Sequence, residues 1–100
     1  MKQFSILAFA FSICTAHAAA PEDSSDCEAW KHKASLYMNW RQQGVPLTEA
    51  IKDTAGNRSR GLLLRAYNEP QQKDFAAQYA ATEQFSESIF RECQTQAGSP

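Results

Sequence analysis

The chain has 100 residues, 21% of them charged, and its formal net charge is −1. This length suffices for one domain, and the near-neutral charge argues against the basic stripe that nucleic-acid binding requires. It argues equally against a polybasic membrane-binding patch. We therefore expect one small domain that has no nucleic-acid partner.

Residues 1–18 have the three parts of a removable secretory signal peptide. Lys2 provides the positive start, positions 4–13 form an apolar run, and positions 16–18 read Ala-His-Ala, with small residues where cleavage requires them. The alternative, an uncleaved membrane anchor, is disfavoured because the apolar run is shorter than the ~20 residues that span a bilayer. We predict a mature domain of residues 19–100, periplasmic or secreted, with no membrane span after cleavage.

Two of the three cysteines remain in this mature domain, because Cys14 would leave with the signal peptide. An even number of cysteines in an exported chain predicts a disulfide, here Cys27–Cys93. Closing a loop of this length stabilises a fold by about 4 kcal/mol in the chain-entropy account. Two free thiols or an intermolecular bridge are the alternatives.

A first helix is predicted from its start and stop signals. Residues 25–28 read Ser-Asp-Cys-Glu, which fits a capping box with Ser25 as N-cap and Glu28 three residues later. Gly44 is the expected C′ residue of a Schellman stop, and Pro46 prevents the helix from continuing.

This helix carries an unusually wide apolar face. One stripe consists of Cys27, Trp30, Ala34, Tyr37 and Met38, and an adjoining stripe of Ala29, Leu36 and Trp40. The remaining arc is polar and holds Glu28, Lys31, His32, Ser35, Asn39, Gln42 and Gln43. A face wider than ~100° predicts either a central helix or one that meets a partner.

Three further helical segments follow. We predict a short helix over 46–53 with Leu47, Ala50 and Ile51 inward, a helix over 59–67, and a long helix over 70–94. The inward stripe of the long helix is Phe75, Tyr79, Thr82, Phe85, Ser86, Ile89, Phe90 and Cys93. The fold class is therefore all-α, a bundle of three to four helices whose first and last members are antiparallel and joined by the disulfide. Trp30 should then approach Ile89 or Phe90, and Tyr37 or Met38 should approach Tyr79 or Phe75.

Few residues are suited to chemistry. His32 and Glu28 lie one turn apart, but a zinc site needs three or four protein ligands. Glu83 and Glu87 lie on the polar side of the long helix, and no serine lies in a nucleophile elbow. We expect no catalytic residue, no metal and no cofactor, and therefore a protein that is not an enzyme.

Leu36 and Trp40 are the candidate partner-binding residues, since tryptophan is a frequent anchor at interfaces. The alternative is that Trp40 packs on Val45 and Leu47 where the chain turns. Arg58, Arg60 and Arg65 form a basic cluster that either is solvated or meets an acidic partner.

In its size, export signal and two cysteines, the chain resembles the small single-disulfide helical proteins of the bacterial periplasm. That group includes acid-stress chaperones, envelope inhibitors and immunity proteins, and the resemblance transfers no functional residue. We expect a non-enzymatic binding protein, such as an inhibitor, an immunity protein or an adaptor. Its partner would be a protein of the envelope or a second copy of the chain. The alternative is a stress chaperone that exposes apolar helix faces conditionally.

Overall fold

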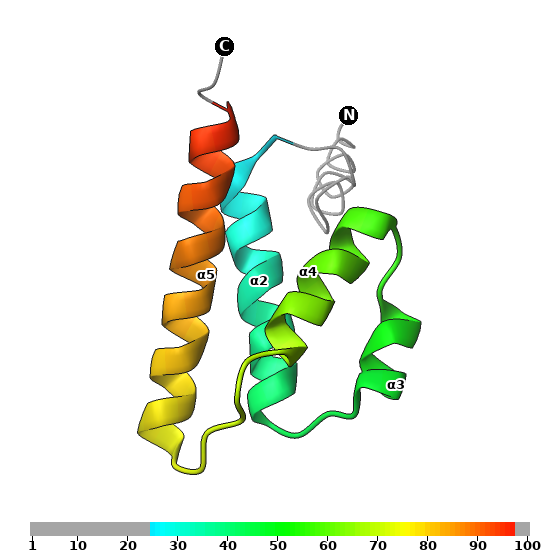
Figure 1. The fold of residues 1–100 in the computed structure, drawn as a ribbon, viewed down its shortest axis with the longest axis vertical. Coiled ribbons are helices and arrows are strands. Elements are labelled where there is room, and N and C mark those ends of the chain that lie inside the picture. The colour runs from blue at the N-terminus through cyan, green and yellow to red at the C-terminus, as the bar shows by residue number, and fades with distance from the viewer. Residues whose placement is uncertain (1–24, 98–100) are drawn as a thin grey trace, which may run out of the picture.

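The computed structural model describes residues 25–97, which form an all-α bundle without strands in that range. The elements in chain order are α2 (Cys27–Gln42), α3 (Leu47–Ala50), the 3-10 turn η3 (Ile51–Asp53), α4 (Asn57–Tyr67) and α5 (Phe75–Ala97). Figure 1 shows α2 and α5 side by side and antiparallel, with α4 crossing α2 at an angle and α3 further out. The predicted fold class is confirmed, whereas the predicted signal peptide lies outside the described residues.

The disulfide joins the first residue of α2 to the C-terminal part of α5. Cys27 and Cys93 are bonded, with their Cα atoms 5.5 Å apart. The bond fixes the antiparallel pair at one end, as the cysteine positions predicted. It closes a loop across 66 positions of sequence, and the resulting loss of unfolded-chain entropy stabilises the fold by about 4 kcal/mol.

The N-terminus of α2 is capped by Asp26, not by Ser25. An Asp26 carboxylate oxygen accepts hydrogen bonds from the backbone N–H groups of Glu28 (3.1 Å) and Ala29 (3.3 Å). One carboxylate therefore satisfies two of the N–H groups that have no partner within the helix. The capping-box prediction was wrong by one position, and Glu28 lies too early in the helix to close such a box.

The C-terminus of α2 has the predicted Schellman geometry. Gly44 has φ +83°, a left-handed conformation that glycine adopts without a Cβ clash. The Gly44 N–H donates to the Arg41 carbonyl (3.1 Å) and the Val45 N–H donates to the Trp40 carbonyl (2.9 Å). These are the two hydrogen bonds that define the motif, and they turn the chain away towards α3.

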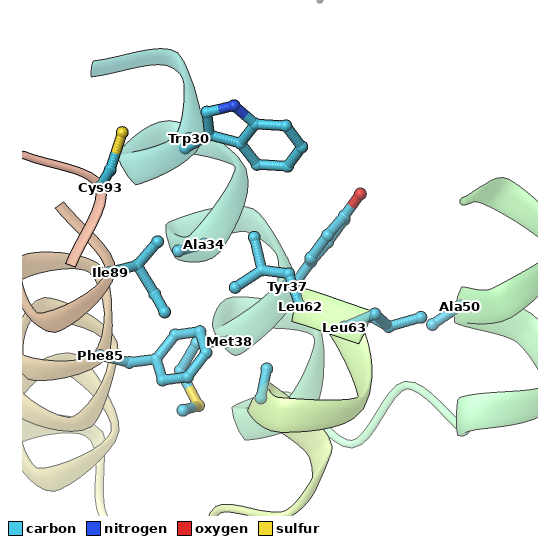
Figure 2. Close-up of a cluster of buried hydrophobic side chains, with 11 residues drawn as sticks. Trp30, Ala34, Tyr37, Met38, Ala50, Leu62, Leu63, Phe85, Ile89 and Cys93 are labelled. Carbon is cyan, nitrogen blue, oxygen red and sulfur yellow. The ribbon is translucent and has the colours of Figure 1, made fainter. Parts of the chain in front are cut away.

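The core is built around α2, which packs on α5 and, less extensively, on α4. Figure 2 shows its main side chains, with Trp30 and Ile89 near Cys93 at the disulfide end. The first predicted stripe of α2 is buried, apart from Cys27 at its margin. The buried hydrophobic residues are Trp30, Ala34, Tyr37, Met38, Ala50, Leu62, Leu63, Ala66, Phe85, Ile89 and Cys93.

The start of α5 differs from the prediction. The helix begins at Phe75 rather than Pro70, and Phe75 and Tyr79 are 82% and 63% exposed instead of inward. Their expected packing against Tyr37 or Met38 is therefore wrong. Counted from the disulfide, α2 ends 15 residues after Cys27, whereas α5 begins 18 residues before Cys93. The first turn of α5 thus extends past the end of α2.

The segment after Gly44 matches the prediction in part. Ala50 is buried and Ile51 packs against the core, but Leu47 is 37% exposed. With only four residues in α3, a single small residue, Ala50, provides its buried contact. The buried Thr54 hydroxyl donates to the Ala50 carbonyl (2.8 Å), which closes the turn before α4.

Candidate protein-binding surface

The largest exposed apolar side chains of the described residues lie on the first two turns of α5. Phe75 and Tyr79 are four residues apart and therefore share one face of the helix. Ala76 and Ala80 are exposed beside them, and no charged residue occurs between Asp74 and Glu83. We call Phe75, Ala76, Tyr79 and Ala80 the aromatic patch.

The aromatic patch is presented by an ordered helix start. The Asp74 carboxylate accepts a hydrogen bond from the Ala77 N–H (2.8 Å), as an N-cap does. The Gln78 amide donates to the Gln72 carbonyl (2.9 Å), so the segment before α5 is tied back to the helix. An apolar surface held in this way loses little conformational entropy when it binds a partner.

A buried amide, Gln42, holds the same segment against the end of α2. Its side chain is fully enclosed, at 1% exposure. The side-chain N–H donates to the Pro70 carbonyl (3.0 Å), and the side-chain oxygen accepts from the Gln72 N–H (2.7 Å). Helix periodicity placed Gln42 on the solvated arc of α2. Its partners lie 28 and 30 residues away, and no sequence signal identified them.

The two residues predicted to bind a partner differ in exposure. Leu36 is 46% exposed, whereas Trp40 is half-buried and packs against the core. The Tyr37 and Trp40 ring centroids are 5.4 Å apart. Leu36 therefore offers a smaller apolar surface on α2, on a different helix from the aromatic patch.

The three arginines of the basic cluster each make a contact within the molecule. The Arg58 guanidinium carbon lies 3.8 Å from the centroid of the Trp30 ring. Arg60 donates to the Thr54 carbonyl (2.9 Å), and Arg65 makes two hydrogen bonds of 2.8 Å to the Glu92 carboxylate. These arginines thus join neighbouring elements of the fold.

Within residues 25–97, two ion pairs connect α5 to the other helices. Arg65 pairs with Glu92 across α4 and α5, and Lys31 pairs with Glu87 across α2 and α5, both at 2.8 Å. The hydrogen bond from Lys31 lowers the pKa of Glu87, and the hydrogen bonds from Arg65 lower that of Glu92. A general acid needs the opposite shift, so Glu87 is suited to pairing and not to proton donation.

Residues 25–97 contain no group of three or more His, Cys, Asp or Glu side chains arranged to hold a metal ion. In the same range, no helix combines the length and the apolar character needed to cross a membrane. Comparison with known protein families, curated proteins and solved structures finds no match to this chain. The fold and the surface define a small disulfide-closed helical bundle that exposes aromatic side chains at one end of α5.

Proposed function

We propose that this chain is a small exported, non-enzymatic binding protein of the envelope, such as an inhibitor, an immunity protein or an adaptor. The aromatic patch is the main support for this proposal, because Phe75 and Tyr79 are 82% and 63% exposed on a capped helix. Aromatic side chains bury 150–250 Å² each and are enriched at protein interfaces. Leu36 is a second candidate contact.

The predicted signal peptide and the Cys27–Cys93 bond support export, because disulfides persist in oxidising compartments. The aromatic patch has the spacing of the helix-in-groove mode of recognition, in which apolar residues at i and i+4 enter a partner's groove. We therefore expect the partner to offer an apolar groove to the first two turns of α5.

Affinity capture from the envelope fraction tests this proposal. The variant Phe75→Ser/Tyr79→Ser should lose the captured partner but keep the wild-type urea midpoint, since both side chains are largely exposed. Leu64→Ser is the matched control, because Leu64 is also exposed, at 47%, but lies on α4. Equal capture by the patch variant and the wild type, or no stoichiometric partner for either, would overturn the proposal.

A stress chaperone is the second candidate. Both ion pairs that tie α5 to its neighbours use carboxylates, Glu87 and Glu92. Acid would protonate them and loosen α5, which would expose apolar surface while the disulfide keeps the chain joined. Suppression of client aggregation at about pH 2–3, below the ordinary carboxyl pKa values of about 4, would favour this function. An unchanged structure without suppression would reject it.

A further inference from the structure

The aromatic patch lies between two exposed residues of opposite charge. Lys73 precedes α5, and Glu83 follows Tyr79 by one turn on the same face of the helix. No charged residue lies between Asp74 and Glu83, and within residues 25–97 neither Lys73 nor Glu83 forms an ion pair. Figure 1 shows the start of α5 at the outer edge of the bundle, away from α3.

Neighbouring charges do not occupy these two groups. The Asp74 carboxylate caps α5, 2.8 Å from the Ala77 N–H, and the positive end of the helix dipole offsets its charge. The pKa of Lys31 is raised by its hydrogen bond to Glu87 and also by the charge of Glu83, but the ion pair of Lys31 is made with Glu87. The charges at both ends of the patch are therefore available to a second molecule.

The aromatic patch is complementary to a second copy of itself in antiparallel orientation. A twofold axis beside the middle of the patch places Phe75 next to Tyr79 of the second copy, because the two residues lie about equally far from the axis along the helix. The same axis places Ala76 next to Ala80 of the second copy, where small side chains let the two helices approach closely. Each contact occurs twice, since a twofold interface uses the same residues on both copies.

This arrangement also brings opposite charges together at both edges. Lys73 and Glu83 lie about equally far before and after the middle of the patch, so Lys73 of each copy lies near Glu83 of the other. A parallel pairing would place Lys73 beside Lys73 and Glu83 beside Glu83, which like-charge repulsion disfavours. The charge pattern therefore selects the antiparallel pairing.

The exposed aromatic area sets the strength of this pairing. Phe75 and Tyr79 are 82% and 63% exposed, and an aromatic side chain buries about 150–250 Å². Four such side chains contribute at most about 1,000 Å², which is less than the ~1,200 Å² of stable interfaces. We therefore expect weak association, with a dissociation constant on the order of 100 μM.

We propose that the free protein forms a weak antiparallel homodimer through the aromatic patch, with Lys73 of each copy facing Glu83 of the other. The homodimer rests on the proposed function, because it uses the same patch as a binding surface. It adds a means of regulation, since the second copy covers Phe75 and Tyr79 and a protein partner has to displace it. Because the association is weak, the patch is covered at high local concentration and free after dilution.

Sedimentation equilibrium of the purified protein up to about 1 mM, roughly ten times the expected dissociation constant, measures this association. The wild type should be largely dimeric at the highest concentration, and Phe75→Ser/Tyr79→Ser should be monomeric throughout. Lys73→Glu and Glu83→Lys should each weaken dimerisation about tenfold, because attraction becomes repulsion at both edges of the interface. Both charge substitutions lie at exposed positions, so the fold is retained.

An equimolar mixture of the two charge variants tests the antiparallel arrangement. The Lys73→Glu copy carries only acidic edges and the Glu83→Lys copy only basic edges, so the mixture should form a heterodimer with about the wild-type affinity. Glu69→Lys is the control, because it changes the net charge as Glu83→Lys does, at an exposed position outside the patch. It should dimerise like the wild type.

Three results would overturn the proposal: a wild type that stays monomeric, a dimer that survives the loss of both aromatic side chains, or a mixture that associates no better than its components. These measurements need no partner and are independent of affinity capture. A monomeric wild type that still captures its partner would reject the homodimer alone. A dimer that captures no partner would reject the proposed function alone.

Discussion

At the scale of single residues, the buried amide of Gln42 links the end of α2 to the chain before α5. It donates to the Pro70 carbonyl and accepts from the Gln72 N–H, so its loss leaves two backbone groups without their partner. An unsatisfied buried polar group costs about 1–3 kcal/mol. Gln42 therefore supports the position of the aromatic patch without being part of it.

We predict that Gln42→Ala lowers the free energy of unfolding by about 2 kcal/mol. The neighbouring substitution Gln43→Ala is the control, because Gln43 is exposed and its side-chain amide donates to the exposed Asn39 side chain. It should change stability by less than about 0.5 kcal/mol. Urea denaturation of both variants measures the difference. Equal midpoints would show that the Gln42 amide does not stabilise this connection.

At the scale of elements, local signals predicted most of α2 and little of the start of α5. Gly44 and the α2 stripe depend on residues close in sequence, and both predictions are confirmed. Periodicity also identified the stripe of α5, but it contains no information on where the facing helix ends. Periodicity therefore predicts an inward Phe75, although this residue lies beyond the end of α2. Tyr79 lies within the length of α2 and is nevertheless 63% exposed, which the end of α2 does not explain. The Arg58–Trp30 contact could not be predicted from the sequence either, because it joins two helices at positions far apart in the chain.

The contacts of α5 also give the fold a pH dependence. The pKa values of Glu87 and Glu92 are lowered in the folded state by hydrogen bonds from Lys31 and Arg65. Their stabilisation is complete above the unfolded carboxyl pKa and is lost as pH falls through the folded values. The urea midpoint should therefore fall between about pH 5 and pH 2.

Glu87→Gln/Glu92→Gln should show a smaller fall over the same pH interval than the wild type. Glu83→Gln is the control for removing a carboxylate from the exposed surface of α5. It should keep the wild-type dependence, and urea titrations at a series of pH values give the comparison. A double variant that falls as steeply as the wild type would show that other carboxylates control acid unfolding.

At the scale of the whole molecule, the disulfide and the core of α2 hold a scaffold with a distinct feature at each end of α5. The disulfide end contains a pocket of about 280 Å³ whose lining includes Trp30 and Arg58. The other end carries the aromatic patch, whose apolar side chains are exposed on a helix fixed by Asp74 and Gln42. We propose that this patch is the surface that binds a protein partner.

Site-specific photo-cross-linking in cells that produce the protein tests this proposed binding surface. A benzophenone amino acid replaces Tyr79 in one protein and Leu64, on α4, in the control. We predict one discrete adduct from position 79 and none of the same mass from position 64. An adduct at twice the mass of the chain would identify the partner as a second copy. No adduct from position 79, or the same adducts from both positions, would contradict the assignment of the aromatic patch as a binding surface.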